Sequence, residues 1–372
     1  MRIIQYIGVI LFFFLVSCEK NDVEPQKTRT LMVYLAGDNN LSGHMQKNIS
    51  SMMSAWKESY NANIVIYFDA PNAAPELYTF RFKGKEVEKQ VLKTYEEMDS
   101  ADPEVLKKIL NEMQDLYPSD SYGLILGSHA SGWIPSGASG RSNRMLHAEP
   151  VLTRSFGKDY TGSNEMDTRD MAKAIPFNKE NLEFILFDAC LMSSIEVLYD
   201  LRDKAKYVIA SPAELPAPGF PYARVMPYFW GKGKDLEKDL VKVCDEFWDY
   251  YNTYNATNRF GTIALIKMDE MEHLFDLTRE VLQGQKENVA TIKQNAVYCY
   301  PMVEYTKHDR FFDLGEYMKY MTEGREGLYK EYRDFLDNQV VIYKNATNPF
   351  YYTEIPEEKF SGIATYIPLS IW

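Results

Sequence analysis

The chain has 372 residues, of which 45% are hydrophobic and 25% charged, and its formal net charge is −12. That length and composition predict a globular protein of one or two domains with a large buried core. The acidic balance argues against nucleic acid as a partner, because binding a phosphate backbone needs an excess of Lys and Arg.

The first 28 residues are predicted to export and tether the protein. A basic start precedes an almost wholly apolar run at Ile3–Val16, which is typical of a secretory signal. The sequence LVSC at Leu15–Cys18 resembles a bacterial lipobox, whose cysteine carries the lipid. We therefore expect a signal peptide at 1–18, a lipid on Cys18 and a flexible tether at 19–28. The protein would then be a monomer anchored to the bacterial cell envelope, at the outer membrane. An ordinary signal peptide that happens to contain a cysteine is the alternative.

Beyond residue 28 the sequence alternates strand and helix patterns. Short runs of branched and aromatic residues predict strands, and apolar residues at helical spacing predict helices. In chain order we expect a strand at 29–36, a helix at 41–56, a strand at 63–69, a hairpin or edge strand at 77–82, a helix at 102–116, a strand at 122–129, a helix at 168–174, a strand at 183–188, a helix at 193–203, a strand at 207–211, a helix at 236–251, a strand at 261–266, helices at 269–282 and 310–321, and a strand at 362–367. Such alternation is typical of an α/β fold with a mostly parallel sheet between helical layers.

Two predicted strands end in reactive side chains. The run at 183–188 is followed by Cys190, and the run that begins at Tyr122 ends at His129. Ligands of open α/β sheets bind beyond the carboxyl ends of the strands, so both side chains are expected at one edge. A thiol and an imidazole brought together by folding are the basic machinery of a cysteine peptidase.

The cysteine count favours a thiol rather than a disulfide or metal site. Besides Cys18, the chain contains Cys190, Cys244 and Cys299, an odd number without close spacing. No clustered Cys or His pattern predicts a metal centre. Cys244 and Cys299 lie in stretches that predict packing roles, which leaves Cys190 as the candidate nucleophile.

Thiol catalysis also needs donors for the tetrahedral oxyanion. The backbone N–H groups of Ala130 and Cys190 are the candidates, and a helix start after Cys190 would help to stabilise its thiolate. The alternative is an inert core thiol at Cys190 and a turn histidine at His129.

Four stretches carry a family resemblance. They are Met32–Leu41 (MVYLAGDNNL), Ile125–Trp133 (ILGSHASGW), Phe187–Met192 (FDACLM) and Ala210–Tyr222, with GFPY at its end. In these the sequence resembles the clostripain family of cysteine peptidases, which have a caspase-like fold. The resemblance implies a caspase-like three-layer peptidase domain at 29–372 with C-terminal helical additions. It maps a His–Cys dyad onto His129 and Cys190.

The resemblance also implies a peptide or protein substrate, commonly cleaved after Arg or Lys. A basic P1 side chain needs a carboxylate in its pocket; Asp188 matches the family pattern and is the first candidate, with Glu214 second. Two departures weaken the analogy: Ala130 stands where the family usually has Gly, and the loop at 212–218 has fewer acids. Asp188 could alternatively be a structural partner.

Relatives of this kind often cleave their own chain between the two catalytic residues. The Gly- and Ser-rich region 134–166 lacks periodicity, and long loops of this type are usually functional or disordered. Arg144 is the preferred cleavage site, with Arg141 and Arg154 as further candidates, although all three could merely be solvated.

No cofactor is required by the sequence, and no EF-hand loop is visible, but the resemblance allows a calcium requirement. Two rival functions remain open. One is a catalytically silent, peptide-binding lipoprotein with a peptidase fold, which the Ala130 departure favours. The other is a different cysteine acyl-transfer enzyme, such as an amidase or a transpeptidase.

Overall fold

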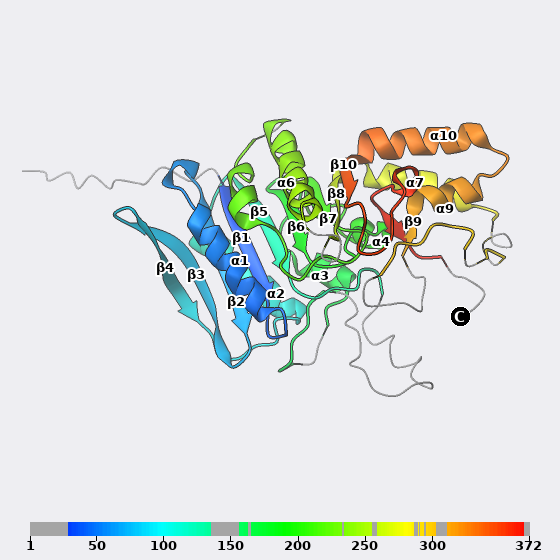
Figure 1. The fold of residues 1–372 in the computed structure, drawn as a ribbon. Coiled ribbons are helices and arrows are strands. Elements are labelled where there is room, and N and C mark those ends of the chain that lie inside the picture. The colour runs from blue at the N-terminus through cyan, green and yellow to red at the C-terminus, as the bar shows by residue number, and fades with distance from the viewer. Residues whose placement is uncertain are drawn as a thin grey trace, which may run out of the picture.

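A single large sheet forms the centre of the protein (Figure 1). The structure is a computed structural model that describes residues 29–134, 156–162, 165–232, 234–254, 259–285, 289, 291–293, 295–302 and 311–367. Its strands lie in the order β10-β8-β7-β6-β5-β1-β2-β3-β4. Their bounds are β1 Arg29–Ala36, β2 Asn63–Ala70, β3 Ala73–Lys83, β4 Glu86–Thr94, β5 Ser121–Gly127, β6 Leu182–Asp188, β7 Tyr207–Ala210, β8 Thr262–Lys267 and β10 Val341–Ala346.

The five central strands are parallel, as predicted, and the edges are not. β2, β1, β5, β6 and β7 are joined by parallel ladders. Antiparallel pairs flank them, with β3 and β4 at one edge and β8 and β10 at the other. The sequence pattern missed β4 and β10. Most β4 side chains are exposed, so the strand lacks the apolar alternation from which a strand is normally predicted.

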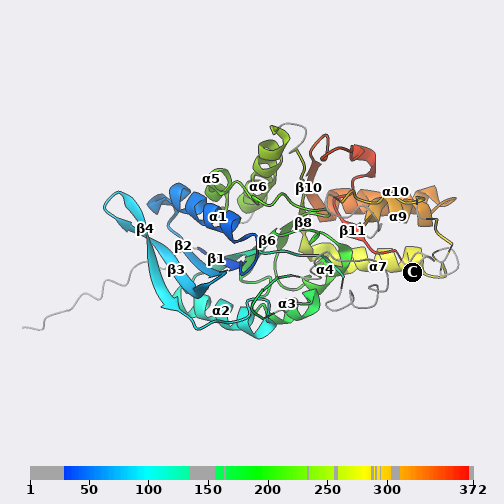
Figure 2. The ribbon, with the colours of Figure 1, turned by 60° about the horizontal axis from the view of Figure 1, so that its bottom comes forward.

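Helices cover both faces of the sheet, which confirms the α/β class (Figure 2). Alternate β1 residues explain this: Leu31 and Val33 point into one apolar cluster, and Met32 and Tyr34 into the other. Side chains from α1, α5 and α6 build the first cluster, whereas α2, α3, α4, α7 and α9 contribute to the second. The helices are α1 Ser42–Ala55, α2 Pro103–Leu116, α3 Thr168–Ala174, α4 Ile195–Asp200, α5 Tyr222–Val225, α6 Lys234–Asn252, α7 Met271–Leu282, α9 Leu314–Met321 and α10 Glu326–Phe335.

The C-terminal part differs from the sequence prediction in its last strand and in its helices, where α10, Glu326–Phe335, was not predicted. The strand expected at 362–367 is only β11, Ala364–Thr365, and it pairs with β9, Phe312–Asp313, in a separate two-stranded sheet. The helix expected from 310 therefore begins at Leu314, because Asp313 caps it through the Glu316 N–H at 2.9 Å.

Several predictions fall outside the described residues. These are the signal segment with Cys18, the tether, and the self-cleavage candidates Arg141, Arg144 and Arg154. Among the helices that the structure does describe, none is both long and apolar enough to cross a membrane.

Candidate active site

His129 and Cys190 follow neighbouring parallel strands at matching positions. Gly127, the last residue of β5, pairs with Asp188, the last residue of β6. Each reactive residue lies two positions beyond its member of that pair. The sheet register therefore brings the imidazole and the thiol to the same edge, as the sequence predicted.

The two turns that carry these residues pack directly against each other. Gly132 has φ +64°, and a Cβ at this position would lie 2.5 Å from the Leu191 carbonyl oxygen. Only glycine permits so close an approach between the backbones. Leu191, next to Cys190, also has a positive φ of 64°, which is costly for a side chain of this kind. The strain beside the thiol was not predicted.

The environment of His129 keeps its ring neutral. Burial, and to a smaller extent the positive charge of Lys158, lower the pKa of His129 to about 4. Its Nε2 lies 2.6 Å from Asn40 Oδ1. With an amide oxygen as the acceptor, Nε2 carries the proton and Nδ1 is left to accept one. Sequence reasoning missed Asn40 as an orienting group, although the run at 37–40 follows the strand next to β5.

Cys190 is half-buried and lies against the loop that follows β7. Its Sγ accepts a hydrogen bond from the Leu215 N–H at 3.3 Å. The expected helix start is corrected: the predicted helix at 193–203 forms only over Ile195–Asp200, so Cys190 lies in a turn before it. Two backbone hydrogen bonds hold this turn in an extended conformation: the Leu191 N–H donates to the Ala213 carbonyl, and the Ser193 N–H donates to the Ser211 carbonyl. A short helix of this kind provides no dipole at the thiol.

Asp188 is the last residue of β6, two positions before the thiol, and its carboxylate is held by hydrogen bonds. Tyr222 donates its hydroxyl to Asp188 Oδ2 at 2.9 Å, and Asn48 Nδ2 lies 3.4 Å from the same oxygen. A Cβ at Gly219 would lie 2.5 Å from both carboxylate oxygens, so glycine makes room for them. Burial raises the pKa of Asp188 to about 6, against the lowering effect of the Tyr222 hydroxyl and the Phe220 N–H. With a pKa of about 6, the carboxylate is mostly charged at pH 7. Because burial destabilises this charged form, a cationic partner would stabilise it.

The remaining predicted residues flank this edge. Glu214 lies in the loop after β7 and is 6% exposed, so it is less accessible to a substrate than the sequence suggested. Ala130 forms an isolated bridge with Phe156. Within the described ranges its N–H donates no backbone hydrogen bond, which suits an oxyanion donor.

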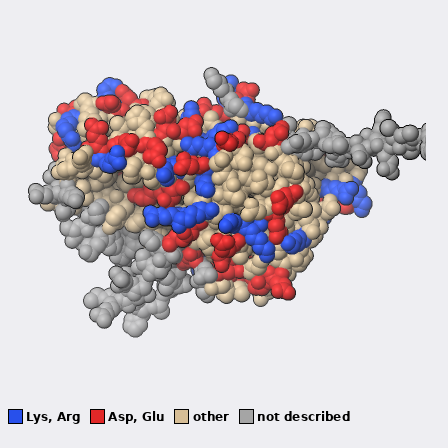
Figure 3. All heavy atoms as spheres, turned by 180° about the vertical axis from the view of Figure 1, so that it is seen from behind, with Lys and Arg blue, Asp and Glu red and all other residues tan. Residues whose placement is uncertain are grey.

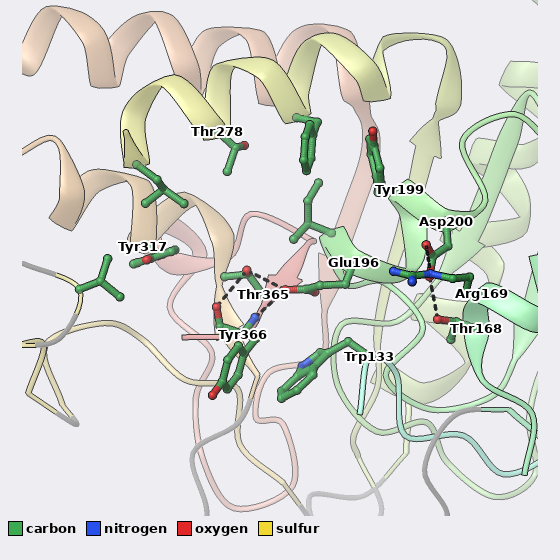
Figure 4. A pocket seen from close by; sticks show the side chains of 14 residues that line it. Trp133, Thr168, Arg169, Glu196, Tyr199, Asp200, Thr278, Tyr317, Thr365 and Tyr366 are labelled. Carbon is green, nitrogen blue, oxygen red and sulfur yellow. Dashed lines mark hydrogen bonds and ion pairs between the residues drawn. The ribbon is translucent and has the colours of Figure 1, made fainter. Parts of the chain in front are cut away.

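A separate cavity of about 920 Å³ lies between α4, α7 and β11 (Figure 4). Trp133 and Tyr366 lie at one side, with ring centres 4.4 Å apart, and Arg169 and Asp200 lie at the other. Neither His129 nor Cys190 lines it. The cavity is therefore distinct from the sheet edge that carries the two predicted reactive residues.

One group of acids near the edge has the chemistry to hold a metal ion. Carboxylate oxygens of Asp38, Glu97 and Asp159 all lie within 4.8 Å of one another. Hard cations such as calcium prefer oxygen ligands of this type.

Comparisons with known proteins identify the family of this chain. The sequence profile of the Clostripain family matches residues 33–368. Clostripain from Hathewaya histolytica is 29% identical over 254 residues, which are 61% of this chain and 47% of that protein. This chain thus spans about half the length of that relative.

Solved structures are similar over nearly the whole chain. An inactive zymogen C11 protease from Parabacteroides distasonis has a TM-score of 0.75 and 30% identity, covering 93% of this chain and 94% of that one. A secreted C11 cysteine protease from Bacteroides thetaiotaomicron, in complex with an irreversible peptide inhibitor, has a TM-score of 0.74 and 29% identity, covering 91% and 92%. The expected three-layer fold is confirmed, and this chain belongs to the clostripain family of C11 cysteine peptidases.

Proposed function

We propose that this protein is a cysteine endopeptidase that uses Cys190 as nucleophile and His129 as proton carrier. The observation that carries the proposal is the register that sets both residues two positions beyond the paired Gly127 and Asp188. The Cys190 sulfur attacks the scissile carbonyl carbon while its proton passes to the neutral His129 ring. The same proton then goes to the leaving amine as the C–N bond breaks, and water hydrolyses the thioester.

The N–H groups of Ala130 and Cys190 are proposed to donate hydrogen bonds to the oxyanion. Asp188 is proposed to receive an Arg or Lys side chain at P1, since a carboxylate that burial has destabilised gains most from a cationic partner. Because the pKa of Asp188 is about 6, cleavage after basic residues should weaken as the pH falls through 6 and the carboxylate takes up a proton. Glu214 is the second candidate for this role.

The processing and location of the protein are part of the proposal. Self-cleavage after Arg144, or after Arg141 or Arg154, would open the chain between the two catalytic residues. A lipid on Cys18 would anchor an exported, monomeric protein to the cell envelope, and a Cys18→Ala variant should then leave the membrane fraction. A calcium requirement is supported by the family and by the acidic group near the site.

The decisive test compares the purified protein with Cys190→Ala and Cys299→Ala variants on a mixed peptide library, read by mass spectrometry. Cys299 is a second half-buried thiol and serves as the matched control. We expect cleavage after Arg and Lys by the parent and by Cys299→Ala, and none by Cys190→Ala. An Asp188→Asn variant should lose the basic preference, by about 100-fold or more in kcat/KM.

Unchanged turnover by Cys190→Ala would refute the nucleophile. A parent protein that binds peptides but neither cleaves them nor reacts with an Arg-chloromethylketone would instead support the silent peptide-binding alternative. Ligated or deamidated products would indicate acyl transfer of another kind.

A further inference from the structure

We propose that the cavity between α4, α7 and β11 binds the N-terminal residue of a peptide, through its α-ammonium group, its first carbonyl and an apolar side chain. The cavity has a volume of about 920 Å³ (Figure 4). Small-molecule sites usually measure about 300–1,000 Å³ and combine an apolar lining with a few polar groups. This inference goes beyond the peptidase function and does not depend on it.

Aromatic side chains from several elements form the apolar walls of the cavity. Tyr199 of α4 stacks on Phe275 of α7 with ring centres 4.2 Å apart. Trp133 packs against Tyr366, with ring centres 4.4 Å apart. Such rings stabilise an apolar side chain by burying it and attract a cation to their π faces. The walls therefore suit a ligand that is both apolar and positively charged.

Glu196 provides the acceptor for a cation. Its side chain extends from α4 toward Thr365 (Figure 4). Oε1 accepts hydrogen bonds from the Tyr366 N–H at 2.9 Å and from the Thr365 hydroxyl at 3.1 Å. Oε2 is buried and has no hydrogen-bond partner among the described residues. A carboxylate oxygen that is shielded from water and lacks a donor is costly, and an ammonium group would satisfy it.

Within the described residues, no cation neutralises this carboxylate. Burial raises the pKa of Glu196, and only hydrogen bonds, chiefly from the Tyr366 N–H, act against it. Arg169, a basic side chain in the lining, pairs instead with Asp200 at 3.8 Å. The described lining thus has one basic side chain and two acidic ones, an excess of one negative charge. This excess favours an ammonium group over a carboxylate.

Trp133 supplies the complementary donor. Its Nε1–H is buried and has no acceptor among the residues that the structure describes. Trp133 contacts the ring of Tyr366, and Glu196 accepts from the backbone of Tyr366, so the unpaired donor and acceptor lie in one part of the cavity. A peptide N-terminus has an ammonium donor and a carbonyl acceptor on adjacent carbon atoms, which matches this pair. An amine without the carbonyl would leave the indole N–H unpaired.

Two threonines of the lining already have partners. The Thr278 hydroxyl donates to a carbonyl of its own helix at 2.7 Å, and the Thr168 hydroxyl donates to Asp200 Oδ2 at 3.1 Å. Selection of the ligand's polar groups therefore rests on Glu196 and Trp133. Both side chains line the cavity and are half-buried as a whole, so a small side-chain rotation presents their buried atoms to a ligand.

The proposed site adjoins the two turns of the candidate active site. Trp133 follows Gly132, which packs against the Leu191 carbonyl, and α4 begins at Ile195, five residues after Cys190. Hydrolysis of a peptide bond creates a free α-amino group. One product of the proposed reaction therefore belongs to the ligand class that this cavity fits.

The test titrates the purified protein with phenylalaninamide by isothermal titration calorimetry. Two related ligands serve as controls: N-acetylphenylalaninamide lacks the positive charge, and 3-phenylpropylamine lacks the carbonyl. We expect one phenylalaninamide per chain. The acetylated ligand should bind about tenfold or more weakly, and the amine without a carbonyl about threefold or more weakly.

Variants of the two polar groups locate the ligand. Glu196→Gln keeps the shape of the side chain and removes its charge, so it should bind phenylalaninamide about tenfold or more weakly than the parent. Trp133→Phe should keep the preference for the free amine and lose the preference for the carbonyl. Glu183→Gln is the matched control, because that carboxylate is also shielded, pairs with Lys206 at 3.0 Å and does not line the cavity. It should bind like the parent.

A parent that does not bind phenylalaninamide, equal affinity for the acetylated ligand, or full affinity in Glu196→Gln would overturn the proposal. If Glu196→Gln does not fold, the comparison of the three ligands on the parent decides alone. Asp188→Asn should bind as the parent does, and a loss there would move the ligand to the proposed P1 site and overturn the proposal as well. The readout is binding, so the result is independent of whether Cys190 cleaves peptides.

Discussion

At the scale of single residues, His129 shows how the surroundings set its chemistry. Its pKa is lowered to about 4 by burial first and by Lys158 second, so the imidazole is neutral at pH 7. A preformed thiolate–imidazolium pair would need a charged imidazole. In the proposed mechanism the thiol proton therefore moves to the ring during the attack, and the ring can accept it because Asn40 occupies the other nitrogen.

Replacing Lys158 by Gln should raise the pKa of His129 from about 4, because a repelling positive charge is removed while burial remains. We expect a rise of about one unit or less. An NMR titration of the His129 ring, assigned by its loss in His129→Gln, measures it. Lys173→Gln, an exposed lysine paired with Asp170, should leave the midpoint unchanged. A midpoint that does not move in Lys158→Gln would show that this charge is screened.

The sequence predicted the position of a site residue only where that residue ends or directly follows a strand. Cys190, His129 and Asp188 each end an apolar run, so the sequence pointed to their common edge. Asn40, Gly219 and Tyr222 act through contacts made by distant segments: Asn40 lies 89 positions from His129, and Tyr222 lies 34 from Asp188. No local pattern contains such pairings.

At the scale of elements, hydrophobic runs predicted the buried parallel strands well and the edges poorly. The pattern of β6, Leu182–Asp188, is almost continuously buried, whereas β4 carries Glu, Lys and Gln side chains on an exposed edge. Charged edge strands avoid pairing with other chains, and that same composition hides them from pattern analysis. β11 was overestimated because the apolar residues around Ile363 serve a small second sheet rather than the large one.

The loop that follows β7 offers a test of the proposed P1 role of Asp188. A Gly219→Ala methyl would lie 2.5 Å from the Asp188 carboxylate, at a residue with φ +71°. We expect a loss of about 1 kcal/mol or more in the free energy of unfolding, together with a collapse of cleavage after Arg and Lys. Gly324→Ala is the control: its φ is +77° but no atom lies within 4 Å of the added Cβ, so it should cost stability without changing specificity. Equal kcat/KM values for both variants would contradict the proposed P1 role of Asp188.

At the scale of the whole molecule, charge is mixed rather than segregated. On the face in Figure 3, acidic and basic side chains lie beside one another. Three ion pairs that involve β3 or β4 also join opposite charges: Lys83–Glu88, Lys89–Glu76 and Lys93–Glu112 on α2. A surface of this kind gives no broad positive field on that face for nucleic acid, in line with the net charge.

The sheet also predicts what self-cleavage would do to the molecule. In the sequence, β5 precedes the region 135–155 and β6 follows it, and a parallel ladder joins the two strands. Gly157 N donates to His129 O at 3.0 Å, and Phe156 is paired with Met166, so the chain beyond the region is held beside the catalytic turn. After a cut, a denaturing gel should show two bands while size-exclusion chromatography with light scattering shows one particle. Two separate peaks would contradict this.

Because β5 and β6 are neighbouring strands, a cut between them would divide the proposed active site between two fragments. One fragment would carry the His129 imidazole and the other the Cys190 sulfur, and each would carry part of the central sheet. Neither half alone could hydrolyse a peptide bond, and only their complementation would restore an enzyme.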